Sequence, residues 1–120
     1  MVHEPVLECS FLIPIRRDAN LSDGELHTQE AWDWLETELF VRFEGFTVSP
    51  GKYQGSYRDP DSGEQVSDES AKYVVAVVES RLDELRTFLS QACIAFQQKC
   101  IYLSIAGHVE FIEAPTNDPP

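Results

Sequence analysis

The stretch FEGFTVSPGKYQGSYRDPDSGEQVSDESAKYVVAVVE, from Phe43 to Glu79, decides the fold of this chain. Its second half contains Lys72 to Val78, a continuous run of β-branched and aromatic residues with the length of a strand. Such a run has no polar face, so it predicts a strand that is buried on both sides.

The first half of the stretch predicts the partner strand, residues 47–58. Pro50-Gly51 and Gly55 interrupt it, and such residues indicate a bulge or kink and an edge position in a sheet. Residues 59–63, Asp-Pro-Asp-Ser-Gly, are typical turn formers. The whole stretch therefore predicts a long β-hairpin.

An amphipathic helix is expected on each side of this hairpin. Thr28 can cap a first helix over residues 29–43, with an apolar stripe at intervals of three and four, while Trp34 and Phe40 lie off the stripe. Ser80 and Asp83 resemble a capping box for a second helix that extends to about residue 98. The first stripe comprises Trp32, Leu35, Leu39 and Phe43, and the second comprises Leu82, Leu85, Leu89, Ala92 and Phe96.

Alternating segments at the two ends of the chain predict the remaining strands. Residues 6–15 place apolar side chains on one face, and residues 101–105 alternate in the same way. Ala106-Gly107-His108 predicts a tight turn into a short strand at 109–112.

The expected order is thus strand, helix, strand, strand, helix, strand, with a possible extra C-terminal strand. This is the split βαβ (βαββαβ) arrangement of the ferredoxin-like α+β fold, an antiparallel sheet with two helices on one face. We expect a single domain over residues 1–113 and a flexible tail over residues 114–120.

Composition limits the function. The chain has 120 residues and a formal net charge of −12, from 21 acidic and nine basic residues. This balance argues against binding of nucleic acid, because there is no cationic field for the phosphate backbone. The acids are spread along the chain, which favours a role in solubility, with an acidic decoy of a nucleic-acid-binding protein as the alternative. Without a long apolar run or a signal peptide, we expect a cytoplasmic protein that does not contact membranes.

The sequence contains no metal or cofactor motif. Cys9, Cys93 and Cys100 form no C-x-x-C pair, and His3, His27 and His108 have no ligand spacing. Counted from Asp59 as a calcium loop, glycine falls at the fifth position rather than the sixth. We therefore expect neither metal nor cofactor.

One cluster of cationic and tyrosine side chains is a candidate binding site. In the expected fold these residues lie at one end of the sheet, where they would suit a small anionic or carboxylate ligand. Pairing of the arginines with surface acids, and packing of the tyrosines at the sheet edge, is the alternative. The cluster comprises Arg16, Arg17, His27, Tyr53, Tyr57 and Arg58.

Short motifs also resemble a family of small uncharacterised bacterial proteins. The residues concerned are Trp32-Asp-Trp-Leu35, Phe43-Glu-Gly-Phe-Thr47, Gly55-Ser-Tyr57 and Asp68. The family pattern is a W-x-x-L helix followed by F-G-G-x-T, G-x-W and an aspartate, from which Glu44 and Tyr57 depart. The resemblance covers roughly residues 10–80 and supports the fold more than any activity.

These observations favour a self-associating ferredoxin-like module that acts through protein contacts or small-ligand binding. The alternative is a small enzyme of the dimeric α+β-barrel type, with His27 as its acid or base. Self-association is expected because Val6, Leu12, Val74 and Tyr102 add apolar surface to the sheet. The simplest assembly is a homodimer or higher homo-oligomer related by rotational symmetry.

The purified protein is expected to carry no stoichiometric metal, because the sequence lacks ligand spacing for one. Elemental analysis checks this. About one equivalent of zinc, iron or calcium per chain would contradict it.

Overall fold

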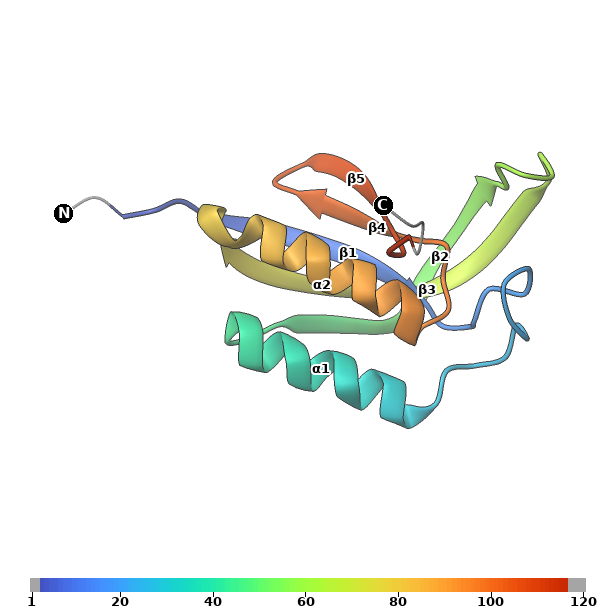
Figure 1. The fold of residues 1–120 in the computed structure, drawn as a ribbon, viewed down its shortest axis with the longest axis horizontal. Coiled ribbons are helices and arrows are strands. Elements are labelled where there is room, and N and C mark those ends of the chain that lie inside the picture. Colours follow the sequence, from blue (N-terminus) through green and yellow to red (C-terminus); the bar gives the residue numbers. More distant parts are fainter. Residues whose placement is uncertain (1–2, 117–120) are drawn as a thin grey trace.

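The computed structural model describes residues 3–116, apart from the side chains of residues 50 and 51. It is a small α+β protein with one antiparallel five-stranded sheet and two α-helices (Figure 1). In chain order the elements are β1 (Val6–Pro14), α1 (Gln29–Phe43), β2 (Thr47–Arg58), β3 (Gln65–Val78), a 3₁₀ turn (Glu79–Arg81), α2 (Leu82–Ala95), β4 (Cys100–Ile105) and β5 (His108–Glu113).

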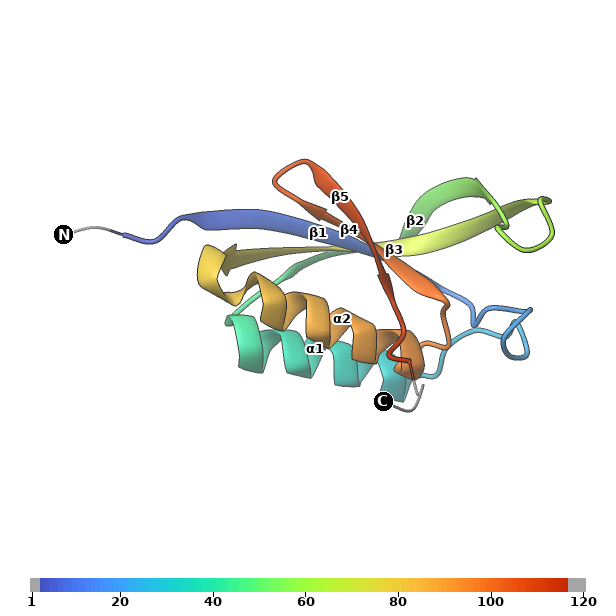
Figure 2. The ribbon, with the colours of Figure 1, turned by 45° about the horizontal axis from the view of Figure 1, so that its top comes forward.

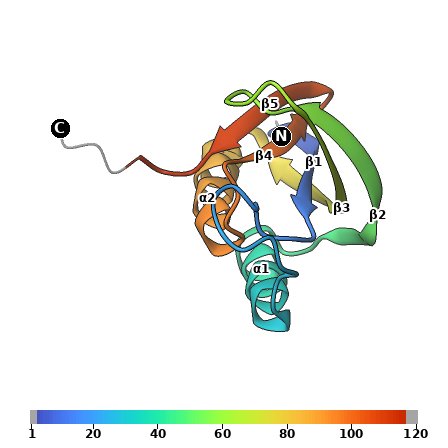
Figure 3. The ribbon, with the colours of Figure 1, turned by 90° about the vertical axis from the view of Figure 1, so that its right-hand side faces the viewer.

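The sheet has the strand order β2-β3-β1-β4-β5, so β1 lies at its centre. Both helices lie on the same face of the sheet, and the opposite face carries no helix (Figure 2). Viewed along the strands, the outer part of the β2–β3 hairpin curves around one side of the sheet (Figure 3).

Alternation along β1 and β3 places the core between the sheet and the helices. Phe11 pairs with Tyr73 and Cys9 with Val75, and all four side chains are 1% exposed or less. Leu35 and Leu39 of α1, with Leu85, Phe88 and Leu89 of α2, cover them at similarly low exposure.

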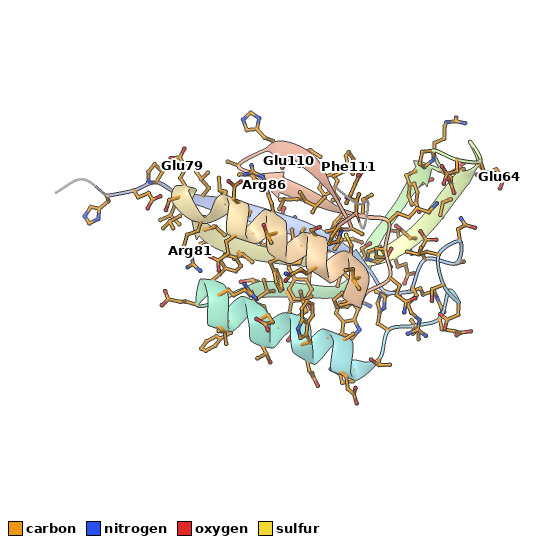
Figure 4. The ribbon with its side chains drawn as sticks, viewed as in Figure 1. Glu64, Glu79, Arg81, Arg86, Glu110 and Phe111 are labelled. Carbon is orange, nitrogen blue, oxygen red and sulfur yellow. The ribbon has the colours of Figure 1, made fainter. Side chains whose placement is uncertain are left out.

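A pair of hydrogen bonds fastens the C-terminal edge of the sheet to α2. The guanidinium of Arg86 donates from Nε and Nη2 to the two carboxylate oxygens of Glu110, over 2.9 and 2.8 Å (Figure 4). This two-point contact holds β5 against α2. β5 pairs with β4 along its length, so the extra C-terminal strand expected from the sequence is confirmed.

The first helix and the edge strand agree with the sequence. α1 spans residues 29–43, and the hydroxyl of Thr28 accepts from the backbone N–H of Ala31. The pairing of β2 with β3 shifts register between Ser49 and Tyr53, where Pro50-Gly51 predicted a bulge. No register shift occurs at Gly55, which pairs regularly with Asp68.

The second helix and β3 depart from the sequence predictions. Ser80 does not cap the second helix: a 3₁₀ turn precedes α2, and the helix ends at Ala95 because Gln97 adopts a left-handed φ of 49°. β3 begins at Gln65, seven residues earlier than expected, and only one of its faces is buried.

The flexible tail expected at 114–120 falls partly on residues 117–120, outside the described part of the chain. Within residues 3–116, neither helix has the length and apolar character needed to cross a bilayer.

A charge on the two faces of β3 is expected to have different effects. Val75 is 1% exposed in the core, so Val75→Asp would bury an unpaired carboxylate at a cost comparable to the total stability of about 5–15 kcal/mol. Val74 is half-buried on the face without helices, so Val74→Asp is expected to fold. Thermal unfolding followed by circular dichroism checks this, and equal losses of Tm in the two variants would contradict it.

Candidate functional site

A cavity lies where the outer half of the β2–β3 hairpin approaches the chain that leaves β1. We call it the loop cavity; its volume is about 820 Å³, and residues 14–20, 54–57 and 66–69 line it together with Gly24 and Gln98. Cavities of about 300–1,000 Å³ are the usual size for small-molecule sites.

Contacts from distant segments hold the walls of the loop cavity. At the hairpin tip, Asn20 donates to a carboxylate oxygen of Asp59 over 3.3 Å, and Lys99 pairs with Asp61 over 3.0 Å. At the base, the side chain of Gln98 is 6% exposed and donates to the backbone carbonyl of Arg16 over 2.8 Å. The cavity is therefore a built feature of the fold, although the two tip contacts are individually weak.

Several polar side chains of the cavity are already occupied by protein partners. Arg17 donates to both carboxylate oxygens of Asp23, over 2.7 and 3.0 Å. Gln54 donates to Glu69 over 3.3 Å. These groups contribute to the wall rather than to a binding function.

Apart from the small hydroxyl of Ser67, three polar side chains of the loop cavity have no hydrogen-bond or ion-pair partner among residues 3–116: the guanidinium of Arg16, the hydroxyl of Tyr57 and the carboxyl of Asp68. They come from the end of β1, from β2 and from β3. Together they offer one cation, one hydroxyl on an aromatic ring and one carboxyl to the same cavity.

The surroundings of two of these groups change their protonation. Burial raises the pKa of the Asp68 carboxyl. Burial also raises the pKa of Tyr57, with a smaller contribution from the acids Asp18 and Asp68. Tyr57 is thus a neutral donor near pH 7, whereas the carboxyl of Asp68 has no ion-pair partner among residues 3–116 and its charged form is disfavoured by burial. A perturbed carboxyl in a cavity is a feature of functional sites.

A second, shallower cavity of about 610 Å³ lies between α1 and β2, and we call it the helix cleft. His27 lies at its end, 9% exposed, and contacts Trp32 and Phe96 edge-on at 5.5 and 4.8 Å between ring centres. Its Nε2 lies 2.7 Å from the carbonyl oxygen of Pro14, and because a carbonyl only accepts, Nε2 carries the proton. Burial lowers the pKa of His27, so the ring is neutral near pH 7.

The structure does not bring the six candidate residues into one site. Arg16, Arg17 and Tyr57 line the loop cavity, whereas His27 lines the helix cleft. Tyr53 and Arg58 line neither cavity. The ring of Tyr53 lies under the ammonium of Lys72 at 5.4 Å, and Arg58 donates to the carbonyl of Gly63 over 2.7 Å.

Asp68 is the residue that the cationic cluster left out. The hairpin register places Asp68 opposite Gly55. Because glycine has no side chain, the carboxylate of Asp68 can lie above it. Counting back from the turn at residues 59–63 would have placed Asp68 beside the Gly55-to-Tyr57 segment.

The cysteines and acids do not converge on a metal site in the described part of the chain. No group of three His, Cys, Asp or Glu side chains there has the geometry to hold an ion. Cys9 and Cys93 are buried, and burial raises the pKa of both thiols, to about 12 for Cys93. The expectation that the protein carries no metal stays a prediction.

Comparison with known proteins relates the chain to two solved structures by fold. No family model and no curated protein matches it, so the resemblance to the bacterial family stays a prediction. The structure is similar to a phage SAM lyase in complex with S-methyl-5'-thioadenosine, with a TM-score of 0.65 and 15% identity over 95% of this chain and 94% of that chain. It is also similar to a phage SAM lyase in the apo state, with a TM-score of 0.59 and 15% identity over 93% and 92% of the two chains.

Replacing Asp68 is expected to stabilise the protein. A carboxyl whose pKa is raised by folding favours the folded state when protonated, and this contribution is lost as the pH rises through the folded pKa. Asp68→Asn should therefore unfold at a higher temperature than wild type at pH 7. The gain in free energy of unfolding should be up to about 0.5 kcal/mol, because Asp68 is a half-buried residue at the protein surface.

The advantage of Asp68→Asn should disappear below about pH 4, where the carboxyl is protonated in both states. Thermal unfolding at several pH values checks this. A variant that is less stable than wild type at pH 7 would show that Asp68 has a stabilising partner.

Proposed function

We propose that the chain is a self-associating ferredoxin-like module that binds a small ligand in the loop cavity. The strand order β2-β3-β1-β4, with two helices on one face, supports the ferredoxin-like assignment. The observation that carries the binding function is the convergence of three polar side chains without protein partners, Arg16, Tyr57 and Asp68, on one cavity.

The groups in the cavity favour a zwitterionic ligand over the simple anion expected from the sequence. Arg16 suits a carboxylate, which its planar guanidinium can bind through two hydrogen bonds. Asp68, with Asp18 and Glu69 in the same lining, suits an amino or other cationic group. Arg17 is already paired with Asp23, so the cavity has no large excess of positive charge.

The aromatic ring of Tyr57 gives this ligand a surface for a planar or cationic part. A molecule with an amino-acid end and a ring end fits these three groups and a cavity of about 820 Å³. S-adenosylmethionine has both ends and a sulfonium, and a phage SAM lyase of similar fold binds S-methyl-5'-thioadenosine. These two compounds are therefore the first ligands to test.

Calorimetric titration with each compound tests the proposal. Wild type is expected to bind S-adenosylmethionine, and Arg16→Gln and Asp68→Asn are each expected to weaken binding about tenfold, because a hydrogen bond to a charged group contributes about 1.5 kcal/mol or more. S-Methyl-5'-thioadenosine lacks the amino-acid end, so its affinity should change little in the two variants.

Arg58→Gln is the matched control, because Arg58 is an exposed arginine outside the loop cavity and should bind like wild type. The proposal fails if wild type shows no heat of binding at about 1 mM ligand. It also fails if Arg16→Gln and Asp68→Asn bind as tightly as Arg58→Gln.

Cleavage of S-adenosylmethionine is the second candidate function. The end-to-end likeness to a phage SAM lyase favours it, since both chains are covered almost completely. Release of S-methyl-5'-thioadenosine breaks the bond between sulfur and the amino-acid chain, and the electron pair stays on sulfur, which becomes a neutral thioether. The freed carbon forms a new bond to an oxygen of the substrate's own carboxylate or of water. Chromatography of the calorimetry samples detects this product. If S-adenosylmethionine stays intact after prolonged incubation, the cleavage function is contradicted and the binding function is unaffected.

The two other functions considered from the sequence receive less support. His27 as an acid or base would have to act from the helix cleft with Nε2 held at the carbonyl of Pro14, away from Arg16, Tyr57 and Asp68. The acidic-decoy function stays a prediction that surface acidity alone supports.

A further inference from the structure

The three ligand-binding candidates lie on the sheet face that the helices leave uncovered. Along β3, Tyr73, Val75 and Val77 point to the helices, so Val66 and Asp68 point to the other face. The register pairs Val66 with Tyr57, which places Tyr57 on that face too. Arg16, two residues beyond Pro14, continues the same alternation from β1 and is exposed.

The same face carries an apolar surface that we call the open-face patch. Phe111 is 66% exposed, Val6 is 59% exposed and Val109 is 47% exposed, although all three lie in regular strands. The centre of the patch is at Val74, which pairs with Ser10, and Leu12 lies at the end nearest the hairpin, between Lys72 and Tyr102. The patch consists of Val6, Leu12, Val74, Ala76, Val78, Tyr102, Val109 and Phe111.

Glu8, Ser10 and Ser104 lie between these side chains. Eight apolar side chains on one sheet face that no helix covers are nevertheless uncommon on an isolated protein and mark a surface that is covered by a partner. Charge indicates which partner. The chain has a net charge of −12, so two copies repel each other over most of their surface. Among the sheet positions that alternate onto the open face, only Glu8, Asp68 and Glu113 are acidic. Two copies therefore approach with least repulsion at this face, and a rotational axis matches the patch with itself.

The dimensions of such an interface reach the loop cavity. A stable interface covers about 800 Å² per partner, which corresponds to a disc with a radius of roughly 16 Å. Pro14, which lines the loop cavity, lies four residues from Ser10 along β1, or about 13 Å at 3.3 Å per residue. An interface centred on Ser10 and Val74 would thus extend to the edge of the loop cavity at Pro14.

We propose that a second copy of this chain covers the open-face patch and forms the outer wall of the loop cavity, so that ligand binding and self-association strengthen each other. This inference rests on the proposed function. The partner would exclude water from the groups at Arg16, Tyr57 and Asp68, and charged contacts strengthen when water is removed. By linkage, a ligand that prefers the assembled form also increases assembly.

Analytical ultracentrifugation with and without S-adenosylmethionine tests the inference on wild type and two matched variants. Phe111→Asp places a charge in the patch, and Phe40→Asp places the same charge on α1, where Phe40 is 64% exposed outside the patch. Wild type and Phe40→Asp are expected to self-associate, and the ligand is expected to lower the concentration at which they do so. Phe111→Asp should weaken association and raise the Kd for the ligand by about fivefold or more. Val74→Asp, nearer the centre, should do both more strongly.

Three outcomes would overturn the inference. One is a wild type that stays monomeric with and without ligand. Another is association of Phe111→Asp and Val74→Asp equal to that of Phe40→Asp. The third is a monomeric patch variant that binds S-adenosylmethionine as tightly as wild type, which would leave the proposed function intact. Absence of binding to every form would instead overturn the proposed function and the ligand link with it, while sedimentation would still decide the interface.

Discussion

The position of Tyr73 at the centre of the sheet is the constraint on which the rest of the structure depends. Its ring stacks on Phe11 of β1 with 5.4 Å between ring centres and only 9° between planes. Trp32 of α1 and Phe46 pack on the same ring at 6.5 and 5.9 Å. One side chain thus links β1, β3, α1 and the segment before β2.

The hydroxyl of Tyr73 makes this packing directional. It donates to a carboxylate oxygen of Glu36 over 2.8 Å, while the ring is 1% exposed. Burial and the neighbouring carboxylate raise the pKa of Tyr73, so the hydroxyl stays neutral and keeps its proton for this bond. A buried aromatic ring with a satisfied hydroxyl fixes both the distance and the rotation of α1 on the sheet.

Local chemistry made much of the fold predictable. The hydroxyl of Thr28 and a stripe at helical spacing set the bounds of α1, and Pro50-Gly51 marked the irregularity of β2. The length of β3 was missed because residues 65–71 are largely polar. Those residues are in a strand because β2 pairs with them, which is a tertiary effect that no local pattern reports.

The candidate site was harder to predict than the fold. Of the six residues predicted as a binding cluster, Arg16, Arg17 and Tyr57 line the loop cavity. The other three, His27, Tyr53 and Arg58, do not line it. The loop cavity depends on the curvature of the hairpin and on contacts such as Asn20 with Asp59. These features join segments that lie far apart in the chain, and their geometry follows from the twist of the whole sheet.

The central place of β1 has a consequence for how the chain folds. Its partners are β3 on one side and β4 on the other, and Cys9 pairs with Ile105 near the opposite end of the chain. During synthesis β1 therefore emerges before both of its partners, and its second side stays unpaired until β4 has been made. Contacts of such long sequence separation slow folding, because loop closure must precede the gain from pairing. The nascent chain would expose an apolar strand with an unpaired edge for most of its synthesis, and chaperones recognise such segments.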